Sequence, residues 1–219
     1  MKSCTSKTAK KVRDKQAEKT SFVQQLSLLP PHACIAYTDG SSYGNPGPAG
    51  AGFTVIPSVL VPGSFSSVSL GVATNNVAEL AALQFLCEHL FELLSRISPS
   101  SRPPVFVFID NRYAIESANS DKKCKANRRQ VGLTRRAVSA LRTLTDVSLR
   151  WVPAHAEVDG NEDADTLAKR GAKGTTSSDP PSPPSPPALA PAQLSPHLVL
   201  DPDLELADDL DDSDHAPLF

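Results

Sequence analysis

The sequence lacks the features that mark membrane-spanning, secreted and disulfide-bonded proteins. It has no run of roughly eighteen apolar residues that could cross a bilayer, and its first residues lack the apolar stretch of a signal peptide. Its four cysteines lie far apart without a C-x-x-C pair, which favours reduced thiols over a disulfide framework. Internal repeats are also absent. We therefore expect an intracellular protein, of the cytoplasm or nucleus, that does not associate with membranes.

The net charge of −2 hides three segments of different charge. Residues 1–30 carry seven Lys and Arg against two acids, residues 31–173 carry fifteen against thirteen, and residues 174–219 carry nine acids with no Lys or Arg. The lysine-rich segment predicts a basic N-terminal arm over 1–31 that is disordered or weakly helical. The prolines and serines of the third segment predict a linker followed by an acidic, disordered tail. The folded domain is therefore expected over 32–173.

Both terminal segments keep two interpretations. The lysines of the arm suit a solubilising leader and a nucleic-acid or localisation patch equally well. The end of the tail mixes leucines with aspartates in LELADDLDDSDHAPLF. A plain disordered tail is the favoured interpretation, and a segment that orders on contact with a protein partner is the other.

Hydrophobic patterning within the expected domain predicts strands and helices. The clearest helix begins at the asparagines of NNVAELAALQFLCEHLFELLSRI, whose apolar positions recur at helical spacing. The run PVFVFID is a continuous apolar strand, which is typical of a central position in a sheet covered on both faces. We expect strands at 33–38, 51–57, 64–72, 104–110 and 147–152, and helices at 75–97, 111–118, 128–144 and 161–173. This order predicts an α/β domain with a mixed sheet flanked by helices.

One aspartate is followed at once by a segment rich in Gly and Pro. In YTDGSSYGNPGPAGAGF, Asp39 follows a short apolar run, and the next residues cannot form a helix because Pro46 and Pro48 lack amide donors. We therefore expect Asp39 at the tip of a strand, followed by a tight turn that presents its carboxylate to a ligand.

Three further acids stand at comparable positions. Asp110 ends the apolar strand PVFVFID, Glu79 lies in the first turn of the long helix, and Asp165 lies in the first turns of the last helix. If the strands that end at Asp39 and Asp110 are parallel neighbours, their C-terminal ends share one edge and the carboxylates come close. Crowded carboxylates repel unless they are protonated or share a cation, and oxygen-bound Mg²⁺ is the usual choice. Each acid alone could instead cap a turn or a helix.

Four segments occur in an order and at spacings that resemble the type-1 ribonuclease H family. They are TDGSSYGNPGPAGAG, TNNVAEL, IDNRYAI and WVPAHAEVDGNEDADTLAKRGA, and the resemblance covers residues 32–173. It implies a five-stranded mixed sheet in which strands one to three are antiparallel and strands four and five run parallel to strand one. It also implies an endonuclease that hydrolyses the RNA strand of RNA–DNA hybrids with a pair of Mg²⁺ ions, for which Mn²⁺ can substitute. The last segment is also similar to the ribonuclease H domains of reverse-transcribing mobile elements.

The resemblance assigns roles to individual residues. It places the metal ions and the catalytic chemistry on four acids, Asp39, Glu79, Asp110 and Asp165. The NE and LA that flank Asp165 fix the helical register and favour it over its neighbours Glu162 and Asp163. His155, in the loop after the fifth strand, matches a histidine that moves protons or assists product release.

Substrate contacts are expected in two regions. The small residues after Asp39 let a nucleic-acid backbone approach the metals, and short amides and hydroxyls suit contacts to the ribose 2′-hydroxyl. Helix capping is the other role open to the asparagine pair after Thr74. The segment from Lys122 to Arg136 is basic but has no aromatic residue, so it can contact phosphates without stacking on bases. A solvated helix face is its alternative. The predicted contacts are Gly40, Ser41, Asn45, Thr74, Asn75, Asn76, Asn127, Arg128 and Arg129.

Two other functions compete with a monomeric nuclease. A non-catalytic module could keep the fold and use the basic segment to hold hybrid or double-stranded RNA, but such a module has no reason to retain four mutually repelling acids. An interaction protein could recruit a partner through its acidic tail while the domain only localises it. The complete set of acids favours the nuclease, with modest affinity for hybrid because the basic segment lacks aromatic residues.

Overall fold

The computed structural model describes residues 4–120, 122, 124–154 and 157–174. The predicted tail beyond Gly174 lies outside these ranges. Within them, no helix combines the length and the hydropathy that a bilayer-spanning helix needs.

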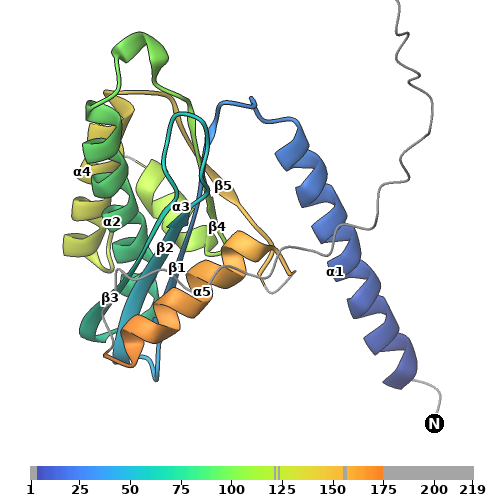
Figure 1. Cartoon of the computed structure of the whole chain (residues 1–219). Coiled ribbons are helices and arrows are strands. Elements are labelled where there is room, and N and C mark those ends of the chain that lie inside the picture. The colour runs from blue at the N-terminus through green and yellow to red at the C-terminus, as the bar shows by residue number, and fades with distance from the viewer. Residues whose placement is uncertain (1–3, 121, 123, 155–156, 175–219) are drawn as a thin grey trace, which may run out of the picture. The chain divides into compact units, whose positions relative to one another are not determined.

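A five-stranded mixed sheet forms the centre of the domain (Figure 1). Its strands are β1 (Cys34–Ser42), β2 (Gly47–Val55), β3 (Ser64–Ala73), β4 (Val105–Ile109) and β5 (Val147–Trp151). They lie in the order β3-β2-β1-β4-β5. β1 pairs antiparallel with β2 and β2 with β3, whereas β1 pairs in parallel with β4 and β4 with β5. The predicted fold class, with its three antiparallel strands, is confirmed.

Helices cover both faces of this sheet. One face carries α2 (Asn75–Ser95), α3 (Arg112–Asn119) and α4 (Arg128–Arg142), and a short 3₁₀ helix, η1 (Pro99–Ser101), precedes β4. On the other face, α5 (Asp159–Ala172) packs against β1, β2 and β3. Successive β4 side chains point to opposite faces of the sheet. Val107 and Ile109 pack in the core beneath α2, and Phe106 and Phe108 pack in a second core on the opposite face. β4 is therefore buried on both faces, as its continuous apolar run predicts.

β1 continues past Asp39 to Ser42, so the aspartate lies inside the strand and not at its tip. The predicted turn begins only at Tyr43, whose N–H donates to the Pro48 carbonyl at 2.8 Å. Asp39 stands opposite Gly52 of β2. The predicted position of the turn was wrong because glycine takes extended backbone as readily as turn conformations.

Small residues bring α5 close to the sheet. A Cβ atom added at Gly50 or Gly52 of β2 would overlap backbone atoms of α5, and one added at Gly160 would overlap the Tyr37 ring. The sequence predicted the last helix from residue 161, but α5 begins at Asp159, so Gly160 lies in its first turn. This close packing fixes how near to the sheet the side chains of α5 lie.

A further helix, α1 (Cys4–Ser27), stands where a disordered or weakly helical arm was predicted over 1–31. Lys, Ala, Gln and Glu favour a helix, and no Gly or Pro interrupts the segment before Pro30. Its last turns pack against the second core: Phe22 is 2% exposed, and its ring meets Phe108 edge-on with 5.1 Å between centroids. The low apolar content did not predict docking, whereas a few apolar residues at helical spacing are enough to dock this end of the helix.

Candidate active site

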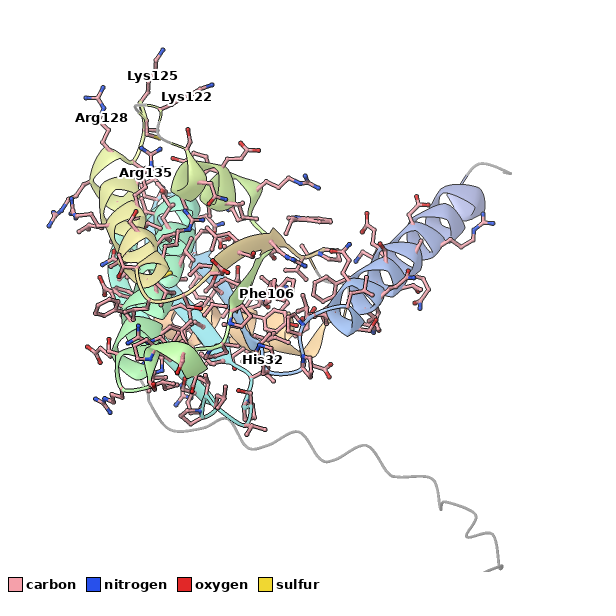
Figure 2. All side chains as sticks on the ribbon, turned by 90° about the horizontal axis from the view of Figure 1, so that it is seen from above. His32, Phe106, Lys122, Lys125, Arg128 and Arg135 are labelled. Carbon is pink, nitrogen blue, oxygen red and sulfur yellow. The ribbon has the colours of Figure 1, made fainter. Side chains whose placement is uncertain are left out.

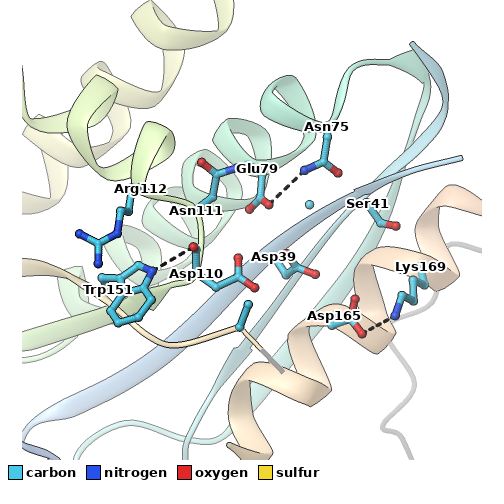
Figure 3. Close-up of a pocket in the computed structure, with 12 residues that line it drawn as sticks. Asp39, Ser41, Asn75, Glu79, Asp110, Asn111, Arg112, Trp151, Asp165 and Lys169 are labelled. Carbon is cyan, nitrogen blue, oxygen red and sulfur yellow. Dashed lines mark hydrogen bonds and ion pairs between the residues drawn. The ribbon is translucent and has the colours of Figure 1, made fainter. Parts of the chain in front are cut away.

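Three acids from different elements meet at one edge of the sheet (Figure 3). Asp39 lies in β1, Glu79 in α2 and Asp110 directly after β4, and each contributes a carboxylate oxygen to a group whose atoms all lie within 4.8 Å of one another. The parallel pairing of Thr38 with Ile109 brings the residues that follow them, Asp39 and Asp110, side by side. The sequence predicted this proximity on the condition that the two strands are parallel neighbours, and the structure meets that condition.

Glu79 reaches the group because α2 begins close above β1. The hydroxyl of Thr74 caps α2 by accepting from the Val77 N–H at 3.4 Å. A Cβ atom on Gly40 would overlap the backbone of Glu79, so only glycine lets the helix lie this close to the strand. The glycine that follows Asp39 therefore also positions the second acid.

The Glu79 carboxylate is buried and only partly satisfied. The residue is 3% exposed, and its Oε1 accepts from Asn75 Nδ2 at 3.4 Å. Among the described residues, its Oε2 has no hydrogen-bond partner. A buried carboxylate oxygen without a partner costs free energy. A cation shared with Asp39 and Asp110 would supply the missing partner, so these residues fit a bound metal ion.

Burial and mutual repulsion raise the pKa values of two of these acids. Burial, followed by the charges of Asp110 and Asp165, raises the pKa of Asp39 to about 8. Burial, followed by the charges of Asp39 and Asp110, raises the pKa of Glu79 well above its ordinary value. At neutral pH the group therefore retains protons unless a cation replaces them. Ligands that are all carboxylate oxygens suit a hard ion such as Mg²⁺.

Asp165 lines the same pocket from α5 but stands outside the group of three. Its Oδ2 pairs with Lys169 Nζ, one helical turn further on, at 2.6 Å (Figure 3). Of the neighbouring acids Glu162, Asp163 and Asp165, it is Asp165 that lines the pocket. His155, the other predicted catalytic residue, lies outside the described residues.

The predicted substrate contacts near Asp39 divide into two groups. Those that line the pocket are Gly40, Ser41 and Asn75. The others lie around the start of α2, where Thr74 is the cap and Asn45 Oδ1 accepts from the Asn75 N–H at 3.2 Å. Asn76 Oδ1 accepts from Asn111 Nδ2 at 3.5 Å. Asn45, Thr74 and Asn76 thus hold the helix end that carries Asn75 and Glu79.

The predicted contacts at the start of α4 lie away from the pocket. They are Asn127, Arg128 and Arg129. Both arginines are exposed, and Arg128 Nε donates to the Cys124 carbonyl at 3.2 Å. Figure 2 shows Arg128 together with Lys122 and Lys125 at one extremity of the domain. The structure therefore separates the acidic pocket from the basic segment.

Five pocket-lining residues were not predicted as site residues, namely Asn111, Arg112, Trp151, Ala154 and Lys169. The Arg112 guanidinium lies over the Trp151 ring at 4.4 Å, and Trp151 Nε1 donates to the Asp110 carbonyl at 3.1 Å. Asn111 and Arg112 directly follow Asp110, and Lys169 is four residues after an acid on the same helix, so their spacing was a usable signal. Trp151 gave no such signal, because its approach to Asp110 depends on the β4–β5 pairing.

Without metal, we expect the free energy of unfolding to fall as the pH rises from about 4 to about 8. The pKa of Asp39 is raised from 3.8 to about 8, so in this window the folded protein holds a proton that the unfolded chain has released. Bound Mg²⁺ replaces that proton, and it should therefore raise the melting temperature more at pH 8 than at pH 5, by about 5 °C or more. Thermal scans with Mg²⁺ or a chelator at both pH values check this. Equal shifts at the two pH values would contradict it.

The order of the strands and the acids clustered in β1 and directly after β4 define a ribonuclease H-like domain. The RNase H family matches residues 31–173, and the chain belongs to this family. The predicted resemblance is confirmed.

Curated relatives carry the same family name. Ribonuclease HI of Streptomyces coelicolor is 34% identical over 150 residues, which cover 63% of this chain and 61% of that protein. Ribonuclease H of Tropheryma whipplei (strain Twist) is 32% identical over 148 residues, which cover 63% of this chain and 83% of that protein. These relatives support the predicted enzyme class, ribonuclease H.

Solved structures show the same fold. RNase H1 of the archaeon Halobacterium salinarum NRC-1 superimposes with a TM-score of 0.52 and 26% identity, covering 65% of this chain and 99% of that one. LC11-RNase H1 in complex with an RNA/DNA hybrid superimposes with a TM-score of 0.51 and 23% identity, covering 64% of this chain and 97% of that one. At that identity the second comparison bears on the fold alone.

Proposed function

We propose that the protein is an endoribonuclease that hydrolyses the RNA strand of RNA–DNA hybrids with a pair of Mg²⁺ ions, or with Mn²⁺ in their place. The observation that carries the proposal is the meeting of Asp39, Glu79 and Asp110 within 4.8 Å, with a buried Glu79 oxygen that has no hydrogen-bond partner in the described part of the chain. Membership of the RNase H family supports hydrolysis of this substrate class.

The four acids divide the work of holding the metal ions. Asp39 is the central ligand, because it stands in the group of three and also interacts with Asp165 across the pocket. Asp165 is the outer ligand, and Lys169 limits its negative charge until metal binds. Bound Mg²⁺ would activate the attacking water and stabilise the leaving 3′-oxygen, which yields 3′-hydroxyl and 5′-phosphate ends. His155, beside the pocket-lining Ala154 in sequence, is proposed to move a proton or to assist product release.

Other side chains position the substrate. Gly40, Ser41 and Asn75 line the pocket. The small Gly40 and Ser41 are proposed to let the RNA backbone approach the acids, and the Asn75 amide is proposed to contact a ribose 2′-hydroxyl. Asn45, Thr74 and Asn76 keep the start of α2 in place. In the basic segment, Asn127, Arg128 and Arg129 are proposed to contact phosphates of the same duplex further along.

The deciding experiment uses the full chain with labelled RNA–DNA hybrid, RNA duplex and DNA duplex of one sequence, with and without Mg²⁺. We expect cleavage of the RNA strand of the hybrid alone, and only with metal. Tight binding of hybrid without cleavage in Mg²⁺ or Mn²⁺ would overturn the nuclease and leave a binding module.

The remaining proposals concern the organisation of the chain. We propose that residues 32–173 form the catalytic domain of a monomer and that residues 174–219 are a linker and an acidic, disordered tail, with binding of a protein partner as the alternative role of the tail; both rest on sequence alone. A chain ending at residue 173 should cleave hybrid at an unchanged rate, and under the alternative it should lose a partner in a pull-down. Retention of every partner by the shortened chain would exclude a role for the tail.

A further inference from the structure

We propose that α1 is a substrate arm, which docks beside the acidic pocket and binds phosphates of the duplex with its basic first half. The inference rests on the proposed function, because it takes the same hybrid as its ligand. α1 precedes the residues 31–173 that match the family, so the family match does not account for it.

Two contacts of different kinds hold α1 to the domain. Phe22 is buried with its ring edge-on to Phe108, which in turn stacks on Tyr37 with 5.3 Å between centroids. Lys19 Nζ pairs with Glu157 at 3.2 Å, and the Lys19 side chain is 31% exposed. An apolar contact and an ion pair separated by one helical turn fix both the position and the direction of the helix.

The second contact is made by the loop that also lines the acidic pocket. Glu157 follows the pocket-lining Ala154 by three residues in the loop between β5 and α5. The C-terminal end of α1 leads into the start of β1, whereas Lys19 contacts the loop that follows the end of β5. Because β1 and β5 run in the same direction, α1 runs antiparallel to them. The turns before Lys19 therefore continue past the edge of the sheet that carries the acids, for about 22 Å back to Cys4 at 1.5 Å per residue.

The part of α1 that extends past the domain is strongly basic. Residues 4–18 contain Asp14 and Glu18 as their only acids and five basic residues, Lys7, Lys10, Lys11, Arg13 and Lys15. In Figure 2 this helix projects on one side of the sheet, and the labelled Lys122, Lys125 and Arg128 project on the other. Two basic elements thus flank a pocket that is itself acidic.

This arrangement fits a polyanion that spans the pocket. The acidic pocket alone repels phosphate until metal binds, and residues 31–173 together are close to neutral in charge. The electrostatic attraction for a duplex must therefore come from the two basic elements. Contacts to phosphates release counterions and give binding a steep salt dependence. They also carry no sequence information, which suits an enzyme that acts along a duplex.

The test replaces Lys7, Lys10, Lys11 and Lys15 with Gln in the full chain and compares it with a variant that has Arg at the same four positions. Gln and Arg both favour helix, so α1 should persist in each, as far-UV circular dichroism verifies. Hybrid binding is measured in an Asp110→Asn background at several salt concentrations. Cleavage is measured in the native background.

We expect the Gln variant to bind hybrid about tenfold more weakly at about 0.1 M salt, with a salt slope shallower by about two or more, and the Arg variant to match the parent. In cleavage, KM should rise while kcat stays unchanged, because the arm does not touch the reacting atoms. Equal affinity and equal salt slope in the parent and the Gln variant would overturn the proposal that α1 is a substrate arm. Failure of the parent to cleave hybrid would overturn the proposed function instead, and the binding comparison would still judge the arm.

Discussion

Replacing Asp110 with asparagine is expected to reduce cleavage of hybrid by at least about a thousandfold. Asparagine keeps the size of the side chain but removes one of the three clustered carboxylates, so the site holds metal poorly and stabilises less charge during the reaction. The fold should persist, because Trp151 donates to the backbone carbonyl of Asp110 and not to its side chain. Single-turnover cleavage in Mg²⁺ measures the loss. Thermal scans should show a smaller stabilisation by Mg²⁺.

The matched control is Asp163→Asn. Asp163 lies on α5 two residues before Asp165 but does not line the pocket, so its removal changes the net charge equally without removing a ligand. We expect its cleavage rate to stay within about twofold of the parent. If the Asp110 variant kept more than a tenth of the parent activity, or if both variants lost activity alike, the assignment of Asp110 would fail.

Replacing Gly52 with alanine is expected to lower the free energy of unfolding by about 3 kcal/mol. The new Cβ would overlap the Ala164 carbonyl and the Ala168 amide, which are backbone atoms of α5 and cannot rotate away. α5 must therefore shift outward and carry Asp165 with it, so cleavage should fall as well. Urea unfolding followed by circular dichroism measures the stability change.

The control for this substitution is Gly132→Ala in α4. There the nearest atom to the added methyl group is the Arg136 guanidinium at 3.9 Å, so nothing is displaced. Alanine favours helix over glycine, and the variant should be more stable by about 0.5–1 kcal/mol. Destabilisation of similar size at Gly132 and Gly52 would show that the close approach of α5 to β2 is not the cause.

Local patterns were enough to predict most elements, and they failed where tertiary contacts decide. The apolar run ending at Asp110 identified a strand buried on both faces, because both faces of β4 need apolar side chains. The turn after Asp39 was misplaced, since glycines permit strand and turn alike and only the pairing with β2 selects the strand. The contact of Trp151 with Arg112 could not be predicted, because it joins a strand end to a helix that is adjacent only in the fold.

The N-terminal segment also shows that local sequence patterns fail where tertiary contacts decide the structure. Its composition predicted a disordered or weakly helical arm, and the docked helix is visible in the sequence only as uninterrupted helix-forming residues with Phe22 and Leu26 four apart. What decides its docking is the aromatic surface of Tyr37 in β1 and of Phe108 in β4, the latter far along the chain. No local pattern in the first thirty residues contains that information.

The burial of Phe22 has a practical consequence for anyone who shortens this chain to the family boundaries. A recombinant fragment that begins at residue 31 would leave aromatic rings of its central strands uncovered at the surface, and such patches promote aggregation at the concentrations used for crystallisation or NMR. Poor solubility of that fragment would reflect the missing cover and not a defective catalytic domain.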